Sequence, residues 1–261
     1  MTSGMRHFVL REGKRYIPDI DQLEIDITWE CNLHCQNCDR SCSQAPTTDR
    51  MSVDQIARFL EQSKESSKRW RRLTVMGGEP TIHPNVSEIL DLLLEYKSYS
   101  APDVEIILAS NGYAHHARQL LMQVPPGISV RNGRKASPRI ETFEPFNVAP
   151  IDIPAIADAD FADGCWITAA CGLGLNRHGF YPCGVAGGIA RVFGLDIALQ
   201  ARPSDAETLR SALDQACRYC GHFLRGEYVP KERRVRLVGE PMSPTWKRAY
   251  ARLPGHQLPK F

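Results

Sequence analysis

Nine cysteines form two separate groups along the 261-residue chain, and their spacing is the strongest chemical signal in the sequence. One group lies near the N-terminus, and it consists of Cys31, Cys35, Cys38 and Cys42. The other lies in the C-terminal third, and it consists of Cys165, Cys171, Cys183, Cys217 and Cys220. In a reducing compartment, cysteines clustered this tightly hold metal more often than they form structural disulfides. The sequence therefore predicts two metal sites.

The first group contains three cysteines with the spacing Cys31-x3-Cys35-x2-Cys38. Thiolates at this density suit an iron–sulfur cluster or a zinc ion. Three thiolates on a four-iron cluster leave one iron without a protein ligand, and an open metal position is where a substrate or cosubstrate binds. The alternative is a structural zinc with His34 or Cys42 as its fourth ligand.

The second group offers five sulfurs, whereas a four-iron cluster takes at most four from the protein. Nearby glycines allow a tight hairpin over residues 165–183 to fold around a metal. A zinc ribbon is the alternative that the residues alone leave open.

The elements around the first group alternate between strands and helices. Strands are expected at residues 23–29, 73–76, 104–109 and 128–130, and helices are expected after Ser52, after Asn85 and at residues 114–123. Ser52 with Gln55, and Asn85 with Glu88, are expected to cap their helices. This order indicates parallel βαβ units, whose chemistry lies at the C-terminal ends of the strands.

The alternation stops after about residue 131, so the fold class predicted is α/β, with a partial, open TIM-like βα barrel. Residues 1–160 would form the barrel, and residues 161–261 a C-terminal cysteine-rich region with its tail. In that region, Ser204 with Glu207 is expected to cap a helix that runs to about Ala216.

The composition of the chain limits the kinds of partner that it is expected to bind. The net charge is +2, and 43% of residues are hydrophobic, which is ordinary for a globular protein. The basic stretches at residues 68–72 and 231–236 carry no interleaved aromatic stripe, so they do not indicate a nucleic-acid partner. No signal-peptide pattern and no apolar run of roughly twenty residues occurs, which predicts a cytoplasmic protein without a membrane partner.

The motif Cys31-x3-Cys35-x2-Cys38, followed after the second strand by Gly77-Gly78-Glu79-Pro80, resembles the radical S-adenosylmethionine (radical SAM) superfamily. The resemblance implies a [4Fe–4S] cluster on the three thiolates and SAM chelated to its fourth iron. It also implies reductive cleavage of SAM to methionine and a 5′-deoxyadenosyl radical, which takes hydrogen from the substrate. The SAM-binding residues so implied are Gly77, Gly78, Glu79, Pro80, Ser110 and Asn111. One departure is Asp39, because an aromatic residue often follows the third cysteine in this family.

The segment His-Gly-Phe-Tyr-Pro-Cys-Gly at residues 178–184 resembles the auxiliary-cluster hairpin of SPASM and twitch domains. The CxxC pair further along resembles the shorter twitch form, which carries one auxiliary cluster. This resemblance implies a second [4Fe–4S] cluster, with Cys183, Cys217 and Cys220 as ligands and Cys171 or Cys165 as the fourth.

The reaction predicted is dehydrogenation, or another radical modification, of a small natural-product intermediate. Modification of a ribosomal peptide by cross-linking, oxidation or epimerisation is the alternative, and a non-catalytic iron–sulfur or zinc protein is an alternative of another class. The resemblance also implies a flavodoxin- or ferredoxin-type electron donor. Acid–base residues are not assigned, and the candidates are Arg131, Glu144, Asp152 and His178.

Overall fold

The computed structural model describes residues 15–138, 146–224 and 242–253, and its centre is one six-stranded sheet. The strands are β1 (Gln22–Thr28), β2 (Arg72–Gly77), β3 (Glu105–Ser110), β4 (Ile128–Asn132), β5 (Leu173–Asn176) and β6 (Gly179–Tyr181). Their order is β4-β3-β2-β1-β5-β6, and every pair is parallel except β5 with β6. The sheet does not close, so the predicted α/β class with an open, mostly parallel sheet is confirmed.

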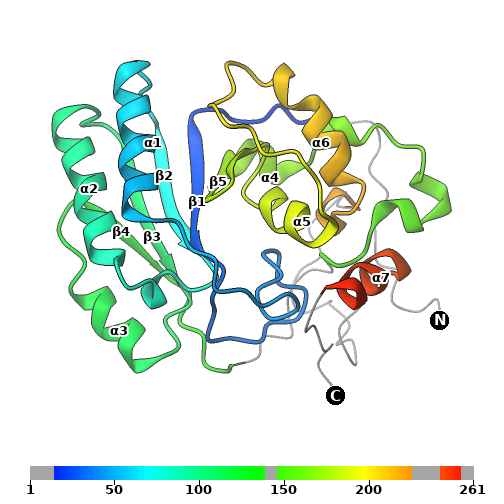
Figure 1. Cartoon of the computed structure of the whole chain (residues 1–261), viewed down its shortest axis with the longest axis horizontal. Coiled ribbons are helices and arrows are strands. Elements are labelled where there is room, and N and C mark those ends of the chain that lie inside the picture. The colour runs from blue at the N-terminus through cyan, green and yellow to red at the C-terminus, as the bar shows by residue number, and fades with distance from the viewer. Residues whose placement is uncertain (1–14, 139–145, 225–241, 254–261) are drawn as a thin grey trace.

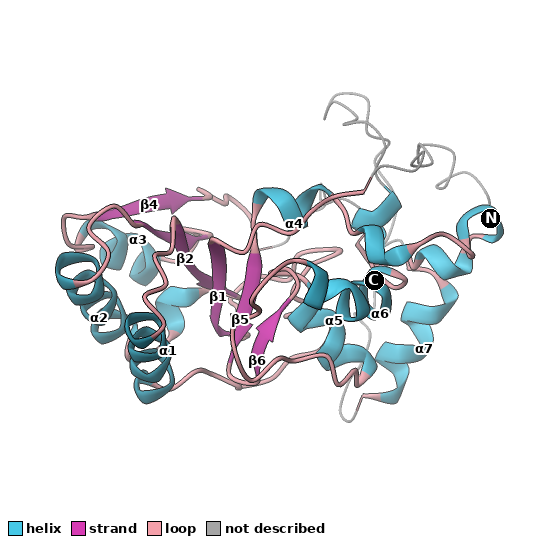
Figure 2. Cartoon of the chain, turned by 90° about the horizontal axis from the view of Figure 1, so that it is seen from above, coloured by secondary structure: helices cyan, strands magenta, loops and turns pink. Residues whose placement is uncertain are grey.

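Helices lie on both sides of this sheet. They are α1 (Val53–Glu65), α2 (Val86–Tyr99), α3 (His115–Met122), α4 (Trp166–Ala170), α5 (Ala186–Phe193), α6 (Arg210–Cys217) and α7 (Pro244–Arg252). Helices α1 to α3 lie together on one side, and α4 to α7 gather on the other (Figures 1 and 2). The C-terminal half of the chain therefore covers the sheet around β1 and β5, which are buried throughout, whereas most of β4 stays exposed.

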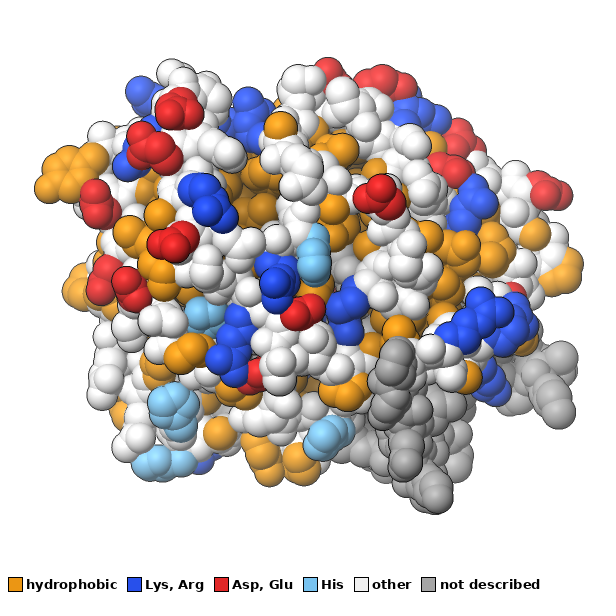
Figure 3. Space-filling model, in the orientation of Figure 1, with side chains coloured by type: hydrophobic (Ala, Val, Ile, Leu, Met, Phe, Trp, Pro, Cys, Tyr) orange, Lys and Arg blue, Asp and Glu red, His pale blue; other side chains and the backbone are white. Residues whose placement is uncertain are grey.

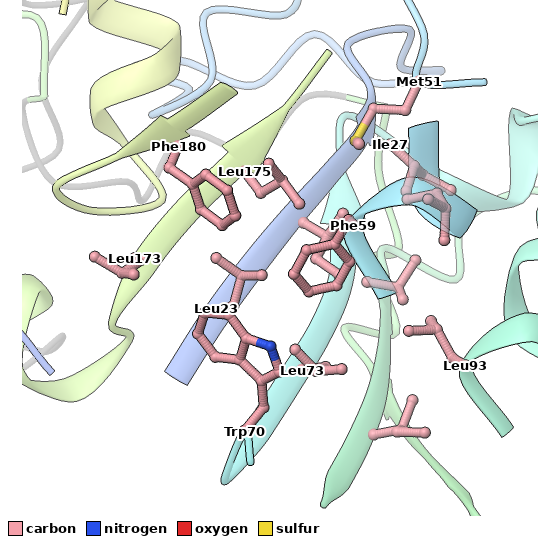
Figure 4. Close-up of a cluster of buried hydrophobic side chains, with 14 of the residues drawn as sticks. Leu23, Ile27, Met51, Phe59, Trp70, Leu73, Leu93, Leu173, Leu175 and Phe180 are labelled. Carbon is pink, nitrogen blue, oxygen red and sulfur yellow. The ribbon is translucent and has the colours of Figure 1, made fainter. Parts of the chain in front are cut away.

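The main hydrophobic core forms because side chains alternate across β1. Leu23, Ile25 and Ile27 are buried on the side of α1 and α2, where Phe59 and Trp70 join them (Figure 4). A second hydrophobic cluster lies within the C-terminal half and includes Trp246 and Tyr250 of α7.

The other face of β1 is polar although it is buried. Gln22, Glu24, Asp26 and Thr28 are all at most 7% exposed. Charged side chains are almost never fully buried unless they are paired, so this face needs partners from the rest of the chain. On the face of the molecule drawn in Figure 3, acidic and basic side chains are intermixed.

Local predictions had mixed outcomes. Both hydrogen bonds of the Ser52–Gln55 capping box are present at the start of α1, which confirms that prediction. The Asn85 cap is wrong in detail, because α2 does begin at Val86 but the Asn85 side chain donates to Glu88 rather than capping a backbone N–H. The Ser204 cap is also wrong, since the Asp205 carboxylate accepts from the Thr208 N–H instead.

No helix within the described ranges has the length and hydrophobicity that a bilayer crossing requires.

Candidate active site

The N-terminal cysteines lie on the loop that leaves the C-terminal end of β1. Cys31, Cys35 and Cys38 are half-buried, whereas Cys42 is buried. Burial raises the pKa of Cys31 to about 12, and the nearby Cys38, Glu79 and Cys35 add to the effect. A hydrogen bond with Cys42 lowers the pKa of Cys38. Cys42 therefore contacts a predicted ligand.

The loop after β2 packs directly against the start of the cysteine loop, and its two glycines make this contact sterically possible. The Gly78 N–H donates to the Thr28 carbonyl at 2.8 Å, and the Glu79 N–H donates to the Glu30 carbonyl at 2.8 Å. A Cβ on Gly77 would lie 2.1 Å from the Thr28 oxygen, and one on Gly78 would lie 2.2 Å from the Glu30 oxygen. The glycine pair thus fixes the strand-end loop beside Cys31.

Glu79 is completely buried, and its carboxylate is occupied by contacts within the protein. One oxygen accepts from the Thr81 N–H at 3.1 Å, the Thr81 hydroxyl at 2.7 Å and the Ser110 hydroxyl at 2.8 Å. The other accepts from the Asn111 N–H at 2.8 Å. In this arrangement Glu79 joins the loops after β2 and β3, so contacts with a cofactor would fall to the half-buried backbone of Gly77 and Gly78.

Asn111 brings the end of β3 to the cysteine loop. Its Nδ2 donates to the Asn32 side-chain oxygen at 2.8 Å and lies 3.9 Å from the Cys31 sulfur. Ser110 and Pro80 are buried, and Pro80 begins a short 3₁₀ helix, Pro80–Ile82. The structure thus brings together the cysteine loop, the glycine pair and Asn111 at the C-terminal edge of three neighbouring strands, as parallel βαβ units require.

The second cysteine group lies in the C-terminal half of the chain and reaches β1 through Cys171. Cys183 interacts electrostatically with Cys165, and Cys220 interacts with both. Cys171 is hydrogen-bonded to Glu24 and interacts with Cys183, and burial raises the pKa of Cys171 to about 12.

Cys217 has a different environment from the rest of this group. It packs in the main core with Leu213 and Phe223, whereas Cys165, Cys183 and Cys220 belong to the C-terminal cluster. Cys165, Cys183 and Cys220 therefore lie in one hydrophobic cluster, and Cys217 lies in the other.

A buried ionic network that sequence reasoning missed lies between the two cysteine groups. The Arg40 guanidinium contacts the carboxylates of Glu24 at 2.6 Å, Asp26 at 3.4 Å and Asp39 at 3.0 Å. Burial raises the pKa of Asp26 to about 7, although Arg40 opposes the shift. In the sequence, Glu24 and Asp26 alternate with the apolar residues of β1. This pattern does not predict the buried network, because it is equally typical of a strand with one solvent-exposed face.

Asp39 lies near the second group. Its carboxylate interacts electrostatically with Cys220 and with His222, which is buried against Phe146. Burial lowers the pKa of His222, so its imidazole is held neutral. The chain directly after Cys38 therefore connects the two cysteine groups.

Within the described ranges, no three His, Cys, Asp or Glu side chains converge on one point as a single metal ion would require. A four-iron cluster has a different requirement, because each thiolate binds a separate iron and the ligands surround the cluster. Three half-buried thiols on one loop, with the half-buried glycine backbone beside them, fit a cluster with one open iron.

The acid–base candidates have unrelated surroundings. Arg131 is exposed on β4, and Asp152 accepts hydrogen bonds from Thr245 at the start of α7. His178 stacks on Trp29 with ring centroids 6.1 Å apart. Glu144 lies outside the described residues.

Comparison with known proteins agrees with the motif at the N-terminal site. Residues 25–124 match the Radical SAM superfamily. The chain is similar to GTP 3′,8-cyclases from Sulfurimonas denitrificans (26% identity over 96 residues), Campylobacter curvus (26% over 125 residues) and Desulforamulus reducens (32% over 99 residues). These matches cover 36%, 45% and 37% of this chain and only 28%, 37% and 29% of the relatives.

Among solved structures, the chain is similar to BtrN in complex with AdoMet and 2-DOIA. The TM-score is 0.42 at 16% sequence identity, over 78% of this chain and 85% of that one. A second BtrN structure, in an open conformation, has a TM-score of 0.42 at 13% identity, over 77% of this chain and 86% of that one.

Proposed function

Because the chain belongs to the radical SAM superfamily, we propose that it is an enzyme that reductively cleaves SAM at a [4Fe–4S] cluster held by Cys31, Cys35 and Cys38. The observation that carries the proposal is the convergence of three strand ends on one place. Asn111 lies 3.9 Å from the Cys31 sulfur, and the loop of Gly77 and Gly78 is hydrogen-bonded to the chain that leads into Cys31.

When bound, the cluster supplies the electron that cleaves SAM, and the resulting radical takes hydrogen from the substrate. The protein's own residues supply position. The glycine backbone offers carbonyl oxygens, which accept hydrogen bonds from a cationic amino group. Glu79 holds Asn111 in place beside Cys31, and it does so without exposing its own charge.

We propose a second [4Fe–4S] cluster in the C-terminal half, as a twitch-like site. Cys165, Cys183 and Cys220 share one environment, which supports them as ligands. The fourth ligand is Cys171, which interacts with Cys183, or Cys217, which forms the CxxC pair with Cys220. A second cluster near the first site would accept the second electron of a two-electron oxidation of the substrate.

The substrate class that we propose is a small, polar natural-product intermediate, with dehydrogenation as the reaction. The residue next to Cys38 is polar, since the Asp39 side chain is 35% exposed and pairs with Arg40 at 3.0 Å. A polar substrate would find hydrogen-bond acceptors there. The electron donor that we propose is of the flavodoxin or ferredoxin type.

The test of the two-site arrangement is an iron count on anaerobically reconstituted protein. The wild type is expected to bind about eight irons per chain, and Cys35→Ala and Cys183→Ala about four each. The two variants should lose different electron paramagnetic resonance signals. Zinc at both sites, or identical signals in the two variants, would contradict the proposal.

A further inference from the structure

Helix α5 contributes a half-buried arginine, Arg191, to the loop that carries the N-terminal cysteines. Its Nη2 donates to the carbonyls of Arg40 at 3.0 Å and Ser41 at 3.2 Å, and its Nη1 donates to the carbonyl of Ala45. All three acceptors lie within seven residues of Cys38 in the printed sequence. One side chain from the C-terminal half thus binds the backbone on both sides of Cys42.

The same guanidinium also lies over Trp29, with its Cζ 4.7 Å from the ring centre. Trp29 precedes Cys31 by two residues and is 2% exposed. A planar guanidinium stacks on an aromatic ring while its N–H groups donate in fixed directions, whereas a lysine ammonium is a compact point charge without this planar geometry. Arg191 therefore contacts the cysteine loop before its first cysteine and after its third.

The loop itself has few regular hydrogen bonds to hold its shape. Ser41 has a positive φ of 52°, and the Ser41 and Ala45 N–H groups donate to the carbonyls of Cys38 and Ser41. A non-glycine residue at such a φ persists only where its surroundings determine it. Arg191 and the Tyr250 hydroxyl, 2.8 Å from the Ser41 hydroxyl, provide those surroundings.

Arg191 also brings a positive charge to this loop. Its guanidinium interacts electrostatically with Cys42 and Cys38, and an arginine stays charged at neutral pH even though burial lowers its pKa. The reduction potential of an iron–sulfur cluster depends on the local charge and on the hydrogen bonds around its sulfurs. A fixed positive charge stabilises the more negative, reduced cluster and so makes reduction easier.

We propose that Arg191 is a positioning residue for the N-terminal iron–sulfur site, which holds the chain around Cys38 and Cys42 and places a fixed positive charge beside it. The charge part of this inference rests on the proposed function, because it needs a cluster at Cys38. The positioning part concerns the protein alone and can be measured without metal.

The first test is hydrogen exchange on the metal-free protein, compared between the wild type, Arg191→Gln and Arg191→Lys. Arg191→Gln is expected to raise the exchange rate of the segment 38–45 by about tenfold, while β1 to β4 exchange as in the wild type. Arg191→Lys should give a smaller increase, since an ammonium cannot reach three carbonyls and the ring together. Arg177→Gln is the matched control, because Arg177 also joins the C-terminal half to this loop, through Asp49 at 2.8 Å, but is exposed.

The second test is the midpoint potential of the N-terminal cluster in reconstituted protein. Arg191→Gln should shift it to a more negative value, whereas Arg191→Lys and Arg177→Gln should stay near the wild type.

Unchanged exchange of segment 38–45 in Arg191→Gln would overturn the positioning role, and so would a uniform increase over the whole chain in both Arg191 variants. Equal potentials in all four proteins would overturn the charge effect. Absence of any cluster would count against the proposed function instead, and the exchange result would still decide the positioning role.

Discussion

The Glu79 carboxylate accepts a hydrogen bond from the Asn111 backbone N–H at 2.8 Å, and this contact ties the loop after β2 to the loop after β3. Glu79, the acidic residue of the Gly77-Gly78-Glu79-Pro80 motif, therefore has a structural role. A side chain that the sequence suggests as a cofactor contact is completely buried, and it holds the residue that does reach the cysteine loop.

Replacing Glu79 by Gln is therefore expected to destabilise the protein. The amide would turn a donor toward groups that already donate, and it would leave one of them without an acceptor. The expected loss is about 2–4 kcal/mol in the free energy of unfolding. Denaturant unfolding checks it, with Glu88→Gln at an exposed position as the control. A loss as small as that of the control would show that Glu79 is not the tie between the two loops.

Gly78→Ala is expected to displace the chain before Cys31, because the new Cβ would lie 2.2 Å from the Glu30 carbonyl oxygen. Most of the iron at the N-terminal site should be lost, while the electron paramagnetic resonance signal of the second cluster remains. Gly194→Asn is the control, since a Cβ added there would meet no atom of another part of the chain within 4 Å, and Asn tolerates its φ of 66°. Normal iron loading of Gly78→Ala would mean that the close approach is not required.

Asp26 predicts a pH dependence of stability. Burial raises its pKa to about 7, above the value of an exposed carboxyl, so the folded state favours the protonated form. The stability that this group contributes is present at low pH and is lost as the pH rises through about 7. The free energy of unfolding of the wild type, relative to Asp26→Asn, should therefore fall between about pH 4 and pH 7.5, by an amount on the order of 1–4 kcal/mol. A constant difference across this range, or one that grows with pH, would contradict the assignment.

Alanine substitution of the second cysteine group distinguishes its ligands. Cys165→Ala should lose about four of the eight irons, as Cys183→Ala does, because the two thiols share one environment. Whichever of Cys171→Ala and Cys217→Ala behaves in the same way identifies the fourth ligand. If Cys165→Ala binds all eight irons, Cys165 is not a ligand. The ligands of the second cluster are then Cys171, Cys183, Cys217 and Cys220.

The sheet's first four strands were predictable because their signals are local. Alternation in β1, the Ser52–Gln55 capping box and the Gly77-Gly78 stop each depend on residues close together in the chain. The site elements follow from the same signals, since parallel strands bring their C-terminal ends to one edge.

The rest of the molecule depends on contacts between distant residues. β5 pairs with β1, and nothing near Leu173 in the sequence specifies that partner. Arg40 and Arg191 look like ordinary surface arginines, because their burial comes from elements in the other half of the chain. Helices α5 and α7 were missed for different reasons. Val185 gives no capping signal at the start of α5, whereas Ser243 and Pro244 are a local start signal for α7 that went unused.

The most direct test of the proposed radical SAM activity is SAM cleavage. Anaerobically reconstituted protein would be reduced with dithionite in the presence of SAM, and 5′-deoxyadenosine would be measured by chromatography. The wild type is expected to form 5′-deoxyadenosine, and Cys35→Ala is expected to form none while it keeps the iron of its second site. A wild-type protein that binds iron at both sites but forms no 5′-deoxyadenosine, or a Cys35→Ala variant that forms as much as the wild type, would contradict it.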